Sequence, residues 1–134
     1  MFGSFDISTS ALNAQRLRME TIASNVASMD DAVDPKGRVA PYRRLFPIFE
    51  PEQTADGGTG VHVSRIEEDT TTPFRRVLDP GHPLHDAEGY VSYPTVDLST
   101  EMVNAMEATR AYEANITAIE TTKSMISATL RVLA

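Results

Sequence analysis

The chain has 134 residues and a formal net charge of -7, with 12 Lys and Arg against 19 Asp and Glu. This acidic balance argues against nucleic-acid binding, because affinity for phosphates requires clustered basic side chains. The absence of cysteine excludes disulfides, thiolate metal ligands and a cysteine nucleophile. No apolar run approaches the roughly 20 residues that cross a bilayer, and the N-terminus lacks the pattern of a secretory signal. We therefore expect no membrane insertion and no cleaved signal peptide.

Residues 7–29 are predicted to form the first helix, because apolar side chains recur every seven residues and a second row follows three positions on. The first row is Phe5, Leu12, Met19 and Val26, and the second is Ser8, Gln15, Ile22 and Met29. Asp6 or Ser8 is expected to cap the helix, since a short oxygen-bearing side chain accepts from the free amides of the first turn.

The middle of the chain, residues 31–96, is predicted to hold loops and short strands. "GVHVSRI" at 60–66 alternates apolar and polar residues in the period of a strand, and "FRRVL" and "GYVSY" are further candidates. "TADGGTG" at 54–60 is typical of a turn. The proline-rich "PYRRLFPIFEPEQ" is expected to be extended, but it cannot be a central strand because proline has no N–H to donate.

The stretch "DPGHPLHDAEGY" at 79–90 places three possible metal ligands, His82, His85 and Asp86, within five residues, and His62 could supply a fourth. A zinc site needs such donors in a rigid tetrahedral frame. Gly81 and the neighbouring prolines favour a turn instead, and no predicted helix places the two histidines on one face. We therefore interpret this stretch as structural, and expect no metal, no cofactor and no catalytic residue.

Residues 98 to about 132 are predicted to form a second, longer helix with two rows. One row is Met102, Thr109, Ile116, Lys123 and Leu130, and the other is Leu98, Ala105, Tyr112, Ile119, Ile126 and Leu133. Such rows, sustained for about five heptads, are typical of a helix packed along other helices. Its length of roughly 50 Å exceeds the roughly 33 Å that the first helix can cover, so apolar surface should remain for a partner. A long amphipathic helix packed within its own domain remains an alternative.

Three stretches carry a resemblance: "ALNAQRLRMETIASNVAS", "PFRRVLDPGHPLHDAEGYVSYPTVD" and "EMVNAMEATRAYEANITAIETTKSMISATLRVL". In this order and spacing, the chain resembles the bacterial flagellar basal-body rod proteins, and the middle stretch is similar to the proximal-rod members. One departure is "ASMDD" at 27–31, where the family usually continues with a second Asn and a Thr.

The resemblance implies a mainly α fold in which the terminal helices, residues 1–30 and 97–134, pair as one discontinuous antiparallel coiled coil. Residues 31–96 would form a small β-rich arm. It also implies export from the cytoplasm through the flagellar type III export apparatus to the periplasmic rod. There the subunit would assemble with other rod proteins and with itself into a helical shaft that transmits torque.

Assembly is expected to rest on the apolar rows of the two helices. The residues predicted to pack between subunits are Leu12, Met19, Ile22, Val26, Met29, Leu98, Met102, Tyr112, Ile116, Ile119, Ile126, Leu130 and Leu133. Two other hypotheses use the same sequence differently. A soluble helical adaptor would bind a partner helix through these rows, and a small metal-dependent hydrolase would be built on the histidines and Asp86.

Overall fold

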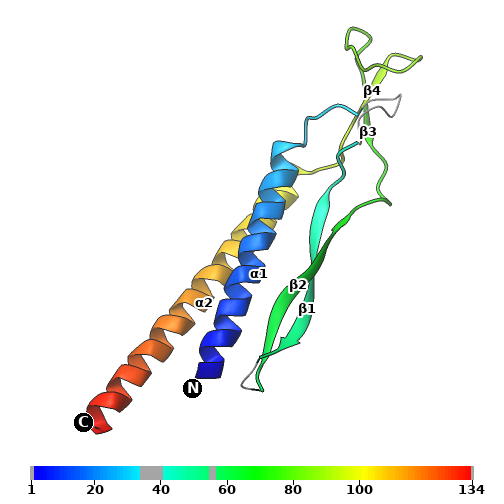
Figure 1. Ribbon diagram of the computed structural model, residues 1–134. Coiled ribbons are helices and arrows are strands. Elements are labelled where there is room, and N and C mark those ends of the chain that lie inside the picture. The colour runs from blue at the N-terminus through cyan, green and yellow to red at the C-terminus, as the bar shows by residue number, and fades with distance from the viewer. Residues whose placement is uncertain (1, 34–40, 55–56, 134) are drawn as a thin grey trace.

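The computed structural model describes residues 2–33, 41–54 and 57–133. The molecule is elongated, with two long helices and two antiparallel hairpins (Figure 1). The elements in chain order are α1 (Phe2–Ala27), β1 (Leu45–Gln53), β2 (Thr59–Glu68), β3 (Arg75–Leu78), β4 (Tyr90–Tyr93) and α2 (Leu98–Leu133). The expectation of two terminal helices around a β-containing middle is confirmed.

Helix α1 begins at Phe2, earlier than predicted, so the expected caps Asp6 and Ser8 lie inside the helix. That prediction was wrong because the first turns gain tertiary contacts that local capping rules do not include. A Cβ added to Gly58, near the tip of the β1–β2 hairpin, would lie 3.0 Å from Ile7 Cδ1. At its other end α1 runs into a hydrogen-bonded turn, in which Asp31 N donates to Ser28 O at 3.3 Å.

Helix α2 begins where the sequence predicted, because Asp97 caps it. The Asp97 carboxylate accepts hydrogen bonds from Thr100 N at 2.9 Å and from the Thr100 hydroxyl. The helix is 36 residues long, about 54 Å, and runs antiparallel beside α1 (Figure 1). Among the described elements, α2 has a close backbone approach only to α1.

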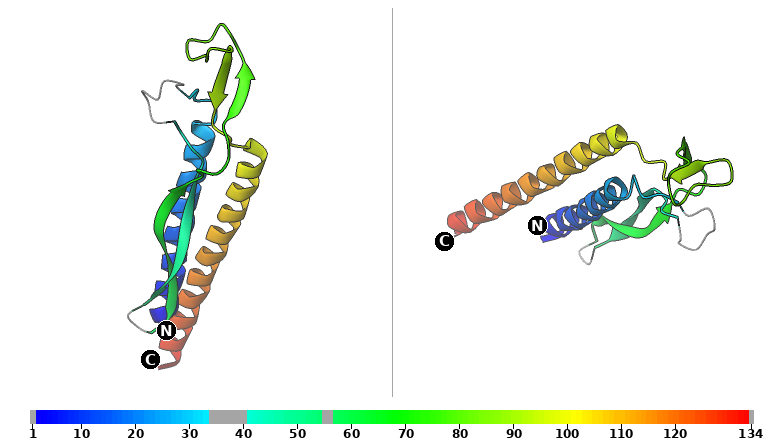
Figure 2. Two further views of the ribbon diagram at one scale, coloured as in Figure 1. Left: turned by 90° about the vertical axis from the view of Figure 1, so that its right-hand side faces the viewer. Right: turned by 90° about the horizontal axis from the view of Figure 1, so that it is seen from above.

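The β1–β2 hairpin is longer than predicted and lies along α1 (Figure 2). The register shifts between Ile48 and Phe49, as in a β-bulge. Pro47 and Pro51 are tolerated because β1 pairs on one side only. Thus the proline-rich stretch is extended and not central, as predicted; of the predicted turn at 54–60, residues 55–56 lie outside the described residues.

The second hairpin, β3–β4, projects beyond the helices at the end away from both termini (Figure 1). Both predicted strands form, and the stretch at 79–90 is the loop that connects them. Val33 bridges to Ser92 of β4, and Val33 N donates to Ser92 O at 2.7 Å. This bridge connects the segment after α1 to the projecting hairpin.

The interior of the described chain contains few large apolar side chains. Its buried apolar residues are Ala14, Ile22, Val33, Val91 and Ala108, and its buried polar residues are Thr21, Asn25 and Glu101. Small side chains allow helices to approach closely, but they bury little apolar area. The large apolar side chains of α2 consequently lie mostly at the surface.

Candidate assembly surface and polar junction

The predicted packing residues of α1 and of the turn after it are at least partly buried. Ile22 is buried, and Leu12, Met19, Val26 and Met29 are half-buried. The Thr109 hydroxyl of α2 lies 3.8 Å from the Met19 sulfur, and Arg18 forms an ion pair with Glu107 at 3.0 Å. These contacts place Met19 of the row at the interface between the two helices of one subunit.

The predicted packing residues of α2 divide into two groups. Tyr112, Ile119 and Ile126 are half-buried. The exposed members are Leu98, Met102, Ile116, Leu130 and Leu133. The inner face of α2 is instead centred on Glu101 and Ala108, both with no exposed area. The structure therefore partly covers the first group and leaves the second group exposed.

Four exposed apolar residues between the start and the middle of α2 form what we call the outer stripe, defined as Leu98, Met102, Met106 and Ile116. Their spacing of four and ten residues places them on adjoining parts of one helix face. Met102 and Met106 are 60% and 55% exposed. Met106 was missed by the heptad pattern because it falls outside both rows. An apolar stripe of this kind on a helix is typical of a surface that packs against another chain.

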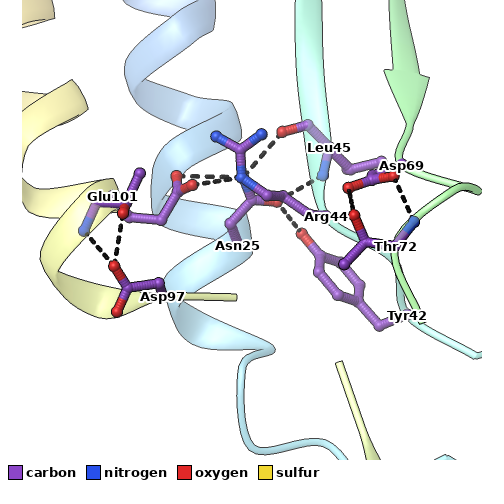
Figure 3. A network of polar contacts seen from close by, with 9 residues as sticks. Asn25, Tyr42, Arg44, Leu45, Asp69, Thr72, Asp97 and Glu101 are labelled. Carbon is purple, nitrogen blue, oxygen red and sulfur yellow. Dashed lines mark hydrogen bonds and ion pairs between the residues drawn. The ribbon is translucent and has the colours of Figure 1, made fainter. Parts of the chain in front are cut away.

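A buried polar junction joins α1, α2 and the start of β1 (Figure 3). The Asn25 side chain pairs with the backbone of Leu45 in both directions: Leu45 N donates to Asn25 Oδ1, and Asn25 Nδ2 donates to Leu45 O, each at 2.8 Å. Asn25 Nδ2 also lies 3.3 Å from Glu101 Oε2. One helical amide thus fixes where the first hairpin starts.

The carboxylate of Glu101 completes this junction. Arg44 Nε donates to Glu101 Oε1 at 2.6 Å, and the Arg44 side chain is 29% exposed. The hydroxyl of Tyr42 donates to Asn25 Oδ1 at 2.7 Å. Partial burial raises the pKa of that hydroxyl above its ordinary value of 10.0. The junction therefore gives the Glu101 carboxylate hydrogen-bond and ion-pair partners, without which burying its charge would be costly.

The sequence analysis did not predict this junction, although two polar residues at inward-facing helix positions indicate it. Glu101 lies three residues after Leu98 and four before Ala105, which are members of a predicted row, so its carboxylate falls on the inner face. Asn25 lies three residues after Ile22 and beside Val26. A polar residue at such a position requires a partner, but the partners are distant in sequence.

A second polar cluster shapes the turn between β2 and β3. The Asp69 carboxylate accepts hydrogen bonds from the backbone and hydroxyl groups of Thr71 and Thr72, also drawn in part in Figure 3. These bonds, with the Thr72 hydroxyl first among them, hold the pKa of Asp69 well below its ordinary value. Arg43 donates to Asp69 O and Thr72 O and lies over the Phe74 ring, 4.4 Å from its centroid.

The histidine-containing loop is arranged as a turn. Asp86 Oδ1 accepts from Tyr90 N at 2.8 Å and from Glu88 N at 3.1 Å, and the carboxylate also pairs with Arg76. His82 Nδ1 accepts from Leu84 N at 3.1 Å. His62 lies on β2 of the other hairpin, 3.8 Å from the Glu52 carboxylate.

The described residues contain no group of three or more His, Cys, Asp or Glu side chains placed to hold a metal ion. In the same residues, neither helix combines the length and apolarity needed to span a membrane.

Comparison with known proteins matches both ends of the chain to flagellar families. The family described as "Flagella basal body rod protein" matches residues 5–30, and "Flagellar basal body rod FlgEFG protein C-terminal" matches residues 87–132. Both matched regions contain a helix that contributes to the surface and junction described above.

Similar curated proteins extend the match over nearly the whole chain. The flagellar basal-body rod protein FlgC of Yersinia enterocolitica is 44% identical over 127 residues, covering 94% of this chain and 92% of that protein. FlgC of Bacillus subtilis is 41% identical, covering 98% and 97%. FlgC of Aquifex aeolicus is 36% identical, covering 96% and 94%.

Proposed function

The chain belongs to the FlgC family of flagellar basal-body rod proteins, and from this membership we propose how its surfaces build the rod. It is a structural subunit of the flagellar basal body and not an enzyme. It assembles with other components of the rod. The adaptor hypothesis is not favoured by these relatives.

We propose that the outer stripe of α2 is the main contact between neighbouring subunits. The observation that carries this proposal is that Met102 and Met106 are more than half exposed, although they lie on a helix whose other face is buried. Burying apolar area contributes about 25 cal/mol per Å², so covering such side chains favours assembly. α1 and the half-buried members of α2 would form the interior of each subunit.

A groove beside α1 offers further contact area. It has a volume of about 310 Å³ and lies between β1 and α2, with Ile22 and Phe46 among its lining residues. Phe49, also in its lining, is 39% exposed. We propose that a neighbouring subunit covers this groove together with the outer stripe.

We further propose the arrangement, export and mechanical role that the resemblance to rod proteins implies. The terminal helices, residues 1–30 and 97–134, act as one coiled-coil unit, and residues 31–96 act as an arm that contacts neighbours outside it. The subunit is exported through the flagellar export apparatus without a cleaved signal peptide, and it joins a periplasmic rod. Torque passes through many repeated packing contacts, and no chemical step is involved.

The outer stripe is tested by Met102→Asp and Ile116→Asp in cells that lack the native chain. Each change introduces a charge that assembly would bury unpaired, so we expect no rod and no motility. Thr121→Asp is the matched control, because Thr121 is exposed on the same helix and lies outside the stripe. Normal motility in both stripe variants, with all chains equally abundant, would show that this surface does not carry assembly.

A further inference from the structure

The C-terminal end of α2 is apolar and has no cover among the described residues. We call the four exposed apolar residues Met125, Leu130, Val132 and Leu133 the α2 end; they are 62%, 62%, 85% and 79% exposed. The cause is length: α2 has 36 residues and α1 has 26, a difference of about 15 Å. A partner chain that packed against the α2 end would remove this apolar area from water.

The charges near the α2 end are mainly positive. Residues 120–133 contain Lys123 and Arg131 against one acidic residue, Glu120. No ion pair joins either basic side chain to another described residue. This end therefore combines exposed apolar side chains with unpaired positive charge.

The β3–β4 hairpin carries the opposite combination. Leu78 lies directly across from Tyr90, so the two side chains share one face, and they are 60% and 37% exposed. Asp79 directly follows Leu78, and Glu88 lies two residues before Tyr90. Neither has an ion-pair partner among the described residues. The face presents apolar area beside unpaired negative charge.

The basic residues of this hairpin are already paired. Arg76 forms an ion pair with Asp86 and lies over the Tyr90 ring, 4.7 Å from its centroid. Arg75 is paired with Asp30 at 3.9 Å. Asp79 N donates to Gly89 O at 3.0 Å, which closes the loop beside Leu78. A loop held in this way loses little conformational freedom when it binds.

Resting on the proposed rod function, we propose that copies of this chain join head to tail, with the α2 end of one copy docked on the Leu78–Tyr90 face of the next. The two surfaces lie at opposite ends of the molecule in every view (Figures 1 and 2), so they cannot meet within one subunit. A contact between two different surfaces that does not close on itself generates a filament. Apolar area and opposite charge match at the same contact.

Disulfide cross-linking tests the contact directly, because the native chain has no cysteine to interfere. A Leu78→Cys, Leu130→Cys double variant is oxidised at a concentration where light scattering shows association. We expect a ladder of covalent multimers, since a disulfide requires close approach of the two positions. Leu78→Cys with Val103→Cys is the control, as Val103 is similarly exposed at 58% and lies outside both the outer stripe and the α2 end. No ladder, no association at any concentration, or equal ladders would overturn the proposal.

A charge exchange provides a second test. One chain carries Asp79→Lys with Glu88→Lys, and another carries Lys123→Glu with Arg131→Glu. Each alone places like charges at the contact, so its association should need about tenfold higher concentration. An equal mixture should recover native association, because each altered end then meets an opposite charge. A mixture no better than its components would overturn the head-to-tail contact, while lost motility in the outer-stripe variants would still support rod assembly.

Discussion

At the scale of single residues, Glu101 connects parts of the chain that are far apart in sequence. It has no exposed area and pairs with Arg44 and Asn25. Removing one partner of a buried pair is costly because the other is left without its hydrogen bond. Arg44 is partly exposed, which limits the loss. We expect Glu101→Ala to lower the free energy of unfolding by about 2–3 kcal/mol, measured by urea denaturation.

Glu101→Gln separates the charge from the hydrogen bonds. Its amide oxygen still accepts from Arg44, so we expect about half the loss seen with alanine. The exposed Glu107 serves as a control: it pairs with Arg18 at the surface, and Glu107→Ala should cost less than about 1 kcal/mol. Equal effects of Glu101→Ala and Glu107→Ala would contradict the role given to the junction.

Three carboxylates make stability depend on pH. The pKa values of Asp69, Asp86 and Asp97 lie below their ordinary 3.8, mainly through hydrogen bonds from the Thr72 hydroxyl, Tyr90 N and the Thr100 hydroxyl respectively. Their contribution is fully present above the unfolded value of 3.8 and is lost as the pH falls through the lower folded values. The midpoint temperature of thermal unfolding should therefore decrease once the pH is lowered below about 4.

Asp97→Asn tests one part of this pH dependence. The asparagine oxygen can still cap α2, but the side chain no longer titrates in this range. We expect the variant to lose less stability than the native chain between neutral and acid pH, compared by calorimetry. If the variant and the native chain lose the same stability between neutral and acid pH, Asp97 has the same pKa in the folded and unfolded chains.

At the scale of elements, the first hairpin is fixed on α1 by a close backbone approach. A Cβ at Gly60 would lie 2.6 Å from Ser10 Oγ, and the same oxygen accepts from Val61 N at 3.1 Å. Gly60→Ala should therefore lower the free energy of unfolding by about 1–3 kcal/mol through overpacking. The loss is measured by denaturation and located by hydrogen exchange in the hairpin.

A double-mutant cycle distinguishes this clash from an effect on strand propensity. Ser10→Ala removes the crowded oxygen, although it also removes the acceptor of Val61 N. Gly60→Ala should cost less in the Ser10→Ala background than in the native chain, giving a favourable coupling. Additive losses would place the effect of Gly60→Ala elsewhere.

The long helix α2 should differ in stability along its length. Residues near Ala108 pack closely on α1, whereas the α2 end is uncovered, and Thr121 and Thr129 direct their hydroxyls back to carbonyls of their own helix. We expect hydrogen exchange in a dilute monomer to be slow around residue 108 and fast beyond residue 125. Strong protection through residue 130 would contradict the view that assembly completes this helix.

The elements were predictable because their signals are local. The heptad rows predicted both helices and the start of α2 at Leu98, and glycine and proline marked the turns. The placement of the first hairpin on α1 was not predictable, since it depends on Gly60 meeting Ser10 and Asn25 pairing with Leu45. The inner face of α2 was only partly predicted, because small residues such as Ala108 fill a helix contact without adding to an apolar row.

At the scale of the whole molecule, α1 occupies the central position. Its backbone comes close to α2 and to both strands of the first hairpin, whereas the backbone of α2 comes close only to α1 among the described elements. The subunit is therefore well supported along α1 and has uncovered apolar surface along α2. A partner that packs against α2 would bury the apolar side chains that this chain alone leaves exposed.

This asymmetry predicts how the purified chain associates. Surfaces of different kinds that do not close on themselves allow growth without a fixed stoichiometry. We expect sedimentation velocity to show mass rising continuously with concentration, accompanied by increasing helicity in circular dichroism. Met102→Asp should suppress both changes, while Thr121→Asp should leave them intact. A single defined oligomer at all concentrations would instead mean that α2 closes on a copy of itself, and the outer stripe would then be a dimer contact and not the rod contact.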